Sequence, residues 1–335
     1  MGKVVTLGEI MLRFSTDEGI RVAQASCFQA HYGGCEANTA VSLANFGHEV
    51  VFASKVPNNG LGQAVKKHLQ SYGVSCQHLL MNGSRLGTYY VESGVGSRAS
   101  QVIYDRGHSS FAEITADEWS EELFAGADIF HLSGITAALS EQWQALVIAL
   151  VKRAKKTGCK ISFDVNYRSK LWSQAEASVF LKQILPFVDY CSAGQLDAVH
   201  LLNIPRRMFT SDQEEISYYY REIQKQYPNI EILYSTKRTV ISADRNKLKG
   251  LLWLDQEYFE STEYSIDPIV DRIGGGDAFA GGLIHGILSK NSPQKIIDFA
   301  TAAAVLKHTV YGDCNQFSSD EVEQFSDNPA GKILR

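Results

Sequence analysis

Short apolar runs rich in β-branched residues alternate with amphipathic helical patterns along most of this 335-residue chain. The apolar runs cover residues 4–7, 50–53, 129–132, 161–164, 188–192, 232–235, 239–243 and 251–254. The helical patterns cover residues 36–46, 61–72, 116–125, 141–157, 174–185, 212–226, 277–289, 293–308 and 319–326. Strands that alternate with helices form parallel βαβ units, so this order predicts an α/β fold with a doubly wound, mostly parallel sheet flanked by helices. Ligands bind such sheets beside the carboxyl ends of the strands.

Two segments interrupt this alternation. Residues 9–32 and 86–106 contain period-two stretches and no helical stripe, so we expect both to be extended. Together they would form a small β-sheet that projects from the core as a lid and excludes water from a substrate. The chain has no low-complexity stretch and no linker, which predicts a single domain over residues 1–335 with lid segments at about 9–32 and 86–106.

Composition excludes several classes of protein. The formal charge of −5 and the even scatter of Lys and Arg argue against a nucleic-acid partner. The absence of an apolar run of about 18 residues argues against a membrane partner. The six cysteines form no Cys-x-x-Cys pair and the nine histidines show no metal-ligand spacing. We therefore expect reduced thiols in a cytoplasmic protein.

A glycine-rich segment near the C-terminus carries the strongest chemical signal. Residues 271–282 read DRIGGGDAFAGG and lead into a helix. Glycines allow close approach of a ligand to the backbone, and the first N–H groups of a helix are unpaired donors, so the segment predicts an anion site. Asp277 lies in the first turn beside this site, where a carboxylate could accept the proton of a hydroxyl that receives a phosphoryl group. A structural turn with an acid that only compensates the helix dipole is the alternative.

A second glycine pair precedes an earlier helix. Residues 32–40 read YGGCEANTA, so that Gly33 and Gly34 open the helix and Asn38 lies one turn inside it. The glycines would let a polar ligand reach the backbone, and an Asn side chain can donate and accept at once, as sugar hydroxyls require. The alternative is a tight turn followed by an ordinary Asn.

The two motifs together resemble the ribokinase-like (PfkB-type) carbohydrate kinase family. Gly-Gly-x-x-x-Asn-x-Ala and Asp-x-x-Gly-x-Gly-Asp-x-Phe occur in the order found in that family, and the resemblance covers essentially the whole chain. It implies a ribokinase-like sheet with a small β lid and transfer of phosphate from ATP, with Mg²⁺, to a sugar hydroxyl. It also implies that Asp277 is the catalytic base and that the N–H groups of Gly274, Gly275 and Gly276 form the anion hole.

Two arginines indicate which class of substrate the protein binds. Arg168 follows a predicted strand, and Arg106 lies at the end of the second lid segment. Two arginines in one pocket would suit a carboxylate, which a guanidinium binds through two hydrogen bonds, although a surface ion pair is the common alternative for each. These segments, with GDCN at 312–315, resemble the 2-keto-3-deoxygluconate kinase branch of the family. The branch implies that the sugar acid contacts Gly34, Tyr89, Tyr104, Arg106, Arg168 and Asp313.

Two stretches depart from the family pattern. Residues 192–197 read SAGQLD where many members have Asn-x-x-Glu, a motif associated with magnesium and phosphate, so the metal ligands are unknown. Residues 235–239 read STKRT where many members have Gly-Glu-x-Gly. Residues 235–239 still offer hydroxyl and cationic groups to the phosphates of ATP, unless this segment is only a solvated basic turn. The nucleotide-binding residues we predict are Ser192, Ser235, Lys237, Gly274 and Gly276.

These observations predict a kinase that phosphorylates the C6 hydroxyl of 2-dehydro-3-deoxy-D-gluconate. Other kinases of the family, acting on fructose, ribose or a nucleoside, are the nearest alternative. A catalytically silent ligand-binding protein comes next, and a hydride-transferring enzyme is more distant because no early Gly-x-Gly-x-x-Gly is present. The sequence leaves the gluconate and galactonate configurations open. We also expect a homo-oligomer, because exposed strand edges often pair between subunits in such kinases.

Overall fold

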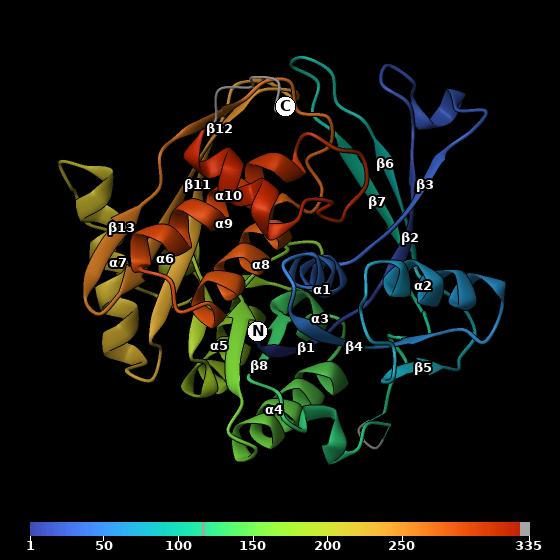
Figure 1. Cartoon of the computed structure of the whole chain (residues 1–335), viewed down its shortest axis with the longest axis horizontal. Coiled ribbons are helices and arrows are strands. Elements are labelled where there is room, and N and C mark those ends of the chain that lie inside the picture. The colour runs from blue at the N-terminus through green and yellow to red at the C-terminus, as the bar shows by residue number, and fades with distance from the viewer. Residues whose placement is uncertain (116–117, 329–335) are drawn as a thin grey trace.

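The computed structural model describes residues 1–115 and 118–328. Its main body is a ten-stranded sheet with the order β13-β12-β11-β10-β9-β8-β1-β4-β5, and β14 pairs with β12 (Figure 1). The six pairings from β11 through to β5 are parallel, and the three pairings made by β12 are antiparallel. The strands are β1 Lys3–Leu7, β4 Glu49–Val56, β5 Leu79–Met81, β8 Ile129–Ser133, β9 Lys160–Asp164, β10 Tyr190–Ser192, β11 Ile232–Val240, β12 Asn246–Leu254, β13 Glu257–Glu260 and β14 Tyr264–Ile266.

Helices cover both faces of this sheet, as the alternation predicts (Figure 1). Neighbouring residues of one strand enter different cores: Val5 belongs to a cluster that includes Trp143 of α4, whereas Val4 belongs to one that includes Leu283 of α8. Strands buried on both faces need apolar residues at successive positions, which explains the continuous apolar runs. The helices are α1 Cys35–Asn45, α2 Gly60–Ser71, α3 Gly134–Ala137, α4 Glu141–Lys156, α5 Gln174–Ile184, α6 Gln195–His200, α7 Asp212–Gln226, α8 Gly275–Leu288, α9 Pro293–Lys307 and α10 Ser319–Asp327.

The two segments expected to be extended form a separate four-stranded sheet, which lies to one side of the main body (Figure 1, upper right). Its order is β3-β2-β6-β7, with β2 and β6 parallel and the two outer pairings antiparallel. The small sheet predicted from the sequence is therefore present. Its strands are β2 Met11–Ser15, β3 Gln29–Gly33, β6 Thr88–Glu92 and β7 Gln101–Asp105.

Two predicted elements differ from the structure. Residues 239–243 are not a strand of their own: β11 continues from Ile232 to Val240 and pairs with β12 throughout, so that one long hairpin replaces two short strands. The helix expected at 116–125 falls partly outside the described residues, since 116 and 117 are not described. Of the remainder, only Glu121–Phe124 is helical, as a short 3₁₀ turn.

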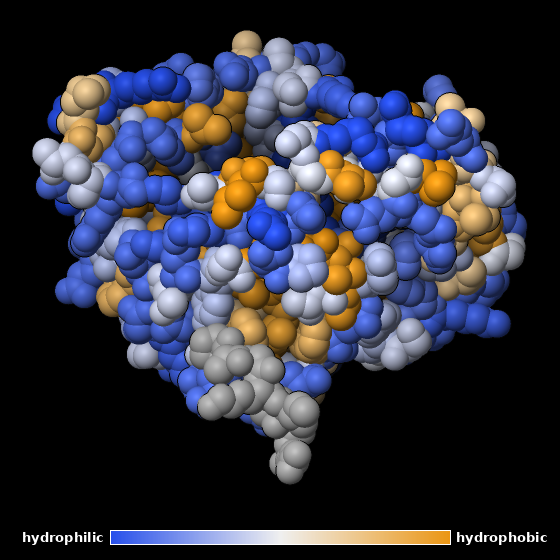
Figure 2. Space-filling view, turned by 90° about the horizontal axis from the view of Figure 1, so that it is seen from above, coloured by the Kyte–Doolittle hydropathy of each residue, from blue (hydrophilic) through white to orange (hydrophobic). Residues whose placement is uncertain are grey.

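Hydrophobic side chains lie mainly in the interior. The face of the molecule seen from above is mostly hydrophilic, with hydrophobic residues in small groups (Figure 2). Among the residues that the structure describes, no helix combines the length and the apolar character needed to cross a bilayer.

Candidate active site

A cavity of about 590 Å³ lies between the main sheet and the small sheet. Residues from β6, β7 and the loop after β7 line one side, and residues from the strand ends, α1 and α8 line the other. Eleven residues predicted for catalysis or for substrate binding meet here, although they come from widely separated parts of the chain: Gly34, Asn38, Tyr89, Tyr104, Arg106, Arg168, Gly274, Gly275, Gly276, Asp277 and Asp313.

The N-terminus of α8 forms one wall of the cavity. Gly274 caps the helix in the left-handed region with φ 83°, and a Cβ there would lie 1.8 Å from the carbonyl oxygen of Asp313. A Cβ on Gly275 would lie 2.3 Å from Cε1 of His308. Only glycine therefore fits at 274 and 275 without rearrangement. The first N–H groups of α8 lack partners within the helix and sit at the positive end of its dipole, so this wall is suited to bind an anion and is the candidate anion site.

Asp277 lies in the first turn of α8, beside the anion site. Burial, followed by the charges of Asp164, Glu36 and Asp313, raises the pKa of Asp277 to about 7, although a hydrogen bond from Asn38 favours the ionised form. That bond joins Asn38 Nδ2 to Asp277 Oδ2 over 2.7 Å. A carboxylate with a pKa near neutrality is well suited to accept a proton during turnover.

The glycine pair before α1 brings three chain segments together. A Cβ on Gly34 would lie 1.9 Å from the carbonyl oxygen of Glu9, and one on Gly33 would lie 2.1 Å from Oδ2 of Asp313. Gly33 is not among the residues that line the cavity and instead packs against Asp313, which does. Asn38 accepts a hydrogen bond from the N–H of Gly34 at 3.3 Å while donating to Asp277. Asn38, predicted to bind sugar, thus also holds the carboxylate in place.

The two predicted arginines reach the cavity from opposite sides. Arg168 follows β9, is exposed and donates to the carbonyl oxygen of Tyr167 at 3.1 Å. Arg106 is largely buried and forms an ion pair with Glu9. Glu9 in turn accepts a hydrogen bond of 2.5 Å from Ser109 Oγ. Within the described residues, Nε of Arg106 is buried without a hydrogen-bond partner, although the side chain lines the cavity.

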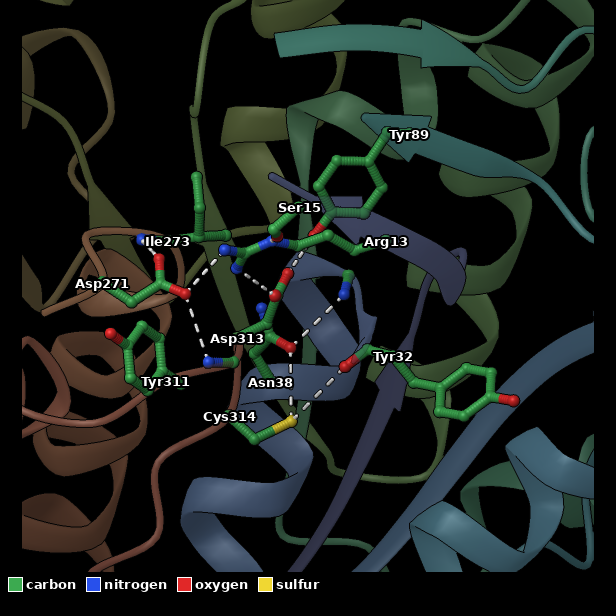
Figure 3. Close-up of polar contacts among 12 residues, drawn as sticks. Arg13, Ser15, Tyr32, Asn38, Tyr89, Asp271, Ile273, Tyr311, Asp313 and Cys314 are labelled. Atoms are coloured by element: carbon green, nitrogen blue, oxygen red, sulfur yellow. Dashed lines mark hydrogen bonds and ion pairs between the residues drawn. The ribbon is translucent and has the colours of Figure 1, made fainter. Parts of the chain in front are cut away.

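The small sheet is joined to the main body by buried charges. Arg13 on β2 donates to Asp313 Oδ1 at 2.7 Å and to Asp271 Oδ2 at 2.6 Å, as Figure 3 shows. The hydroxyl of Tyr89 on β6 bonds to Oδ2 of Asp313. Tyr89 also stacks on Tyr104, its cross-strand neighbour on β7, with ring centroids 5.7 Å apart. Asp313, predicted to contact substrate, therefore also helps to join the small sheet to the main body.

The residues predicted to bind nucleotide do not all line the same cavity. Gly274 and Gly276 line the main cavity, but Ser235 and Lys237 line a smaller one of about 150 Å³. Thr236 borders both cavities, so the two adjoin. Lys237 forms an ion pair with Asp212 there. Ser192 lines neither cavity.

Sequence reasoning missed several residues of the main cavity, and a signal existed for two of them. For Arg238 the signal was the alternation of side chains along a strand. Lys237 and Arg238 are neighbours on β11, so their side chains lie on opposite faces and line different cavities. Arg272 precedes the glycines directly. No sequence signal marked Glu9, whose role depends on a contact with Arg106 about one hundred residues away.

Magnesium has no evident cage of protein ligands. Within residues 1–115 and 118–328, no group of three or more His, Cys, Asp or Glu side chains could hold a metal ion. Asp197, which stands where the family has Glu, accepts a hydrogen bond from the N–H of Gly194 at 2.8 Å and so caps α6. Mg²⁺ is commonly bound through phosphate oxygens and one or two carboxylates, so a phosphate ligand would supply much of its coordination.

Comparison with known proteins gives a consistent result. The model of a family described as pfkB family carbohydrate kinase matches residues 1–320. A Haloferax volcanii protein named 2-dehydro-3-deoxygalactonokinase is 31% identical over 96% of both chains. A solved PfkB family carbohydrate kinase from Listeria grayi is 46% identical, with a TM-score of 0.93 over 97% of this chain and 100% of its own. The solved 2-dehydro-3-deoxygluconokinase of Thermotoga maritima is 37% identical, with a TM-score of 0.94 over 98% of both.

Proposed function

This chain belongs to the pfkB family of carbohydrate kinases, and we propose that it phosphorylates the C6 hydroxyl of 2-dehydro-3-deoxy-D-gluconate with ATP. The observation that carries the proposal is the meeting, in one cavity, of Asp277, the anion site of α8 and two arginines, Arg106 and Arg168. The named relatives support a sugar acid as the substrate class. The family uses ATP with Mg²⁺, which neutralises phosphate charge when bound.

Asp277 would act on the hydroxyl end of the substrate. Its ionised carboxylate takes the C6 hydroxyl proton while the hydroxyl oxygen forms a bond to the γ-phosphorus of ATP, and the bond from that phosphorus to the β-phosphate oxygen breaks to release ADP. The N–H groups of Gly274, Gly275 and Gly276 would hold the negative charge on the transferred group. Asn38 keeps the carboxylate oriented throughout.

Arg106 and Arg168 would bind the carboxylate at the other end of the substrate. Arg106 lines the cavity and is held in place by its ion pair with Glu9. Arg168 is exposed where it lines the cavity. Charge-assisted hydrogen bonds of this kind are stronger than neutral ones and orient the substrate as well as binding it.

The small sheet and the predicted nucleotide-binding residues can serve the same reaction. We propose that the chain is one kinase domain in which the small sheet acts as a lid that excludes water from the cavity. We also propose that the nucleotide extends from Gly274 and Gly276 toward the adjoining cavity of Ser235 and Lys237.

A second candidate substrate is 2-dehydro-3-deoxy-D-galactonate. It is favoured by the 31% identical relative that carries the name 2-dehydro-3-deoxygalactonokinase. The two acids differ in the configuration of one hydroxyl and share the carboxylate and the C6 hydroxyl, so the roles given to Asp277, Arg106 and Arg168 apply to both.

Substitution of Arg168 tests the carboxylate contact. We expect Arg168→Ala to raise KM for the sugar acid at least about tenfold, the loss typical of a charge-assisted hydrogen bond. The same substitution should leave any weak turnover of fructose, which has no carboxylate, within about twofold. Equal losses on the charged and the neutral substrate would contradict the contact.

A further inference from the structure

Two arginines of the main cavity, Arg238 and Arg272, take no part in binding the sugar acid as proposed. β11 extends beyond the core, and its side chains alternate between two sites: Arg238 and Val240 line the main cavity, whereas Ser235 and Lys237 line the smaller one. The alternation aims Arg238 at the cavity that holds Asp277 and the anion site.

Arg238 is charged but unpaired. Over the described ranges 1–115 and 118–328, its side chain makes no ion pair or hydrogen bond. The other arginines of the cavity are restrained: Arg106 by Glu9, Arg168 by a carbonyl oxygen, and Arg272 by the carbonyl oxygen of Ala243 at 2.6 Å. A guanidinium that lines a cavity without an acceptor is available to an anionic ligand.

Arg238 lines the same cavity as His308 and Gly275 at the start of α8. His308 packs against Gly275, where a Cβ would lie 2.3 Å from its ring. Burial first, and then the positive charges of Lys307, Arg238 and Arg272, lower the pKa of His308 to about 4. Arg238 and Arg272 are thus both near enough to act on a ring that touches the glycine loop.

Four arginines line the main cavity together with five acidic residues, and Arg238 lies among the positive charges. Burial, followed by repulsion from Arg272 and Arg168, lowers the pKa of Arg238. Like charges in one cavity repel each other unless an anion binds between them. The single carboxylate of the sugar acid is matched by Arg106 and Arg168, which leaves the charge at Arg238 and Arg272 for a ligand with several negative charges, such as the phosphates of a nucleotide.

We propose that Arg238 is a further catalytic residue, which binds oxygens of the phosphoryl group during its transfer. The inference rests on the proposed function, in which the oxygen of the C6 hydroxyl replaces the β-phosphate oxygen on the γ-phosphorus and the proton passes to Asp277. The guanidinium shares the cavity with the start of α8 and would donate to the phosphoryl oxygens there. Arg272, restrained by Ala243, adds positive charge beside it.

Kinetics of Arg238→Gln test this role, and Arg245→Gln is the matched control. Arg245 is the last residue of the turn that joins β11 to β12, and it forms an exposed ion pair with Asp267 at 3.2 Å. We expect Arg238→Gln to lower kcat at least about 100-fold, the loss typical of one removed transition-state donor, with KM for the sugar acid changed by less than about threefold. Arg238→Lys should recover part of the loss, and Arg245→Gln should stay within about twofold of the wild type. Equal kcat values for the Arg238→Gln and Arg245→Gln variants would overturn the proposal.

Anion binding without turnover separates this inference from the proposed function. Tripolyphosphate should raise the melting temperature of the wild type and of the Arg245→Gln variant, and should have little effect on that of the Arg238→Gln variant. If the wild type phosphorylates no sugar acid but shows this pattern, the proposed function fails and the anion-binding role of Arg238 stands. If all three proteins respond alike to tripolyphosphate, the role assigned to Arg238 is wrong whatever the substrate is.

Discussion

Asp277 must lose its proton to act as a base, yet its surroundings disfavour the charge. Burial and the carboxylates of Asp164, Glu36 and Asp313 raise its pKa to about 7, and the hydrogen bond from Asn38 limits the rise. A base of this strength can take a proton near neutral pH and release it to water afterwards. We therefore expect burial and these four side chains together to set the pH range in which Asp277 can act as a base.

The pH dependence of kcat/KM follows from this pKa. Since only the ionised carboxylate accepts a proton, kcat/KM should rise with pH through a midpoint near 7 and level off above it. Asn38→Leu removes the hydrogen bond that favours the ionised form, so it should move the midpoint upward by about one pH unit. A pH–rate profile of both proteins checks this, and a midpoint that stays in place or moves down in the variant would contradict the role of Asn38.

Asp277→Asn should separate catalysis from stability. The variant lacks the base, so we expect kcat to fall at least about 1,000-fold, while the affinity for the sugar acid is largely kept.

The folded-state pKa of Asp277 is raised above the unfolded value of about 3.9, so ionisation of Asp277 lowers the stability of the fold as pH rises through this window, and the loss is complete above about pH 7. The variant should therefore gain on the order of 1–3 kcal/mol in the free energy of unfolding at about pH 8, and less at about pH 5. Urea unfolding at the two pH values measures this, and a variant less stable than the wild type at both would rule it out.

Single residues were predictable where a local motif marked them. Gly34, Asn38, Gly274 and Asp277 could be assigned because glycine pairs and a helix start leave a pattern within a few positions. Glu9 could not, because its function depends on an ion pair with Arg106 that only the folded chain forms. Arg13 was missed for the same reason, since its partner Asp313 lies 300 positions away.

The start of α8 has a strict geometric requirement at one glycine and none at another. Gly274 has φ 83°, and a Cβ there would lie 1.8 Å from a carbonyl oxygen, whereas a Cβ on Gly276 would meet nothing within 4 Å. We expect Gly274→Ala to lower the free energy of unfolding by at least about 2 kcal/mol through strain and overlap. Gly276→Ala should leave the free energy of unfolding unchanged or slightly raised, because alanine is the better helix former. Denaturant unfolding of both variants decides the matter, and similar values for the two would refute this account of the helix start.

Regular elements were predictable where one face or both faces are buried. The helix expected at 141–157 is α4, because its apolar stripe reports the core that it covers. β11 was harder, since its outer half leaves the core and its polar residues, including Lys237 and Arg238, interrupt the apolar run. The pairing within the small sheet was beyond sequence reasoning as well, because its register depends on partners from two distant segments.

The two sheets are held together by a buried cluster of charges. Burial opposes the charge on Arg13, but Asp313 and Asp271 outweigh that effect and raise its pKa, so the guanidinium is charged in the interior (Figure 3). Replacement of one partner in such a cluster leaves the others buried and uncompensated.

Arg13→Met should therefore destabilise the whole protein. We expect the free energy of unfolding to fall by about 3–5 kcal/mol, since two buried carboxylates lose their common partner. Arg245→Met, which removes the exposed pair with Asp267, should cost less than about 1 kcal/mol. Urea denaturation of both variants gives the comparison, and equal losses would show that the buried cluster does not secure the small sheet.

Release of ADP, measured with ATP and Mg²⁺ over a panel of acceptors, tests the proposed activity most directly. The panel should contain 2-dehydro-3-deoxygluconate and 2-dehydro-3-deoxygalactonate beside fructose, ribose and adenosine. We predict turnover of one or both sugar acids, with kcat/KM at least about 100-fold above that of every neutral acceptor, because only the acids engage both arginines and the base. A neutral sugar that is phosphorylated as well as the acids, or no ADP release with any acceptor, would contradict the assignment of this cavity to a sugar-acid kinase.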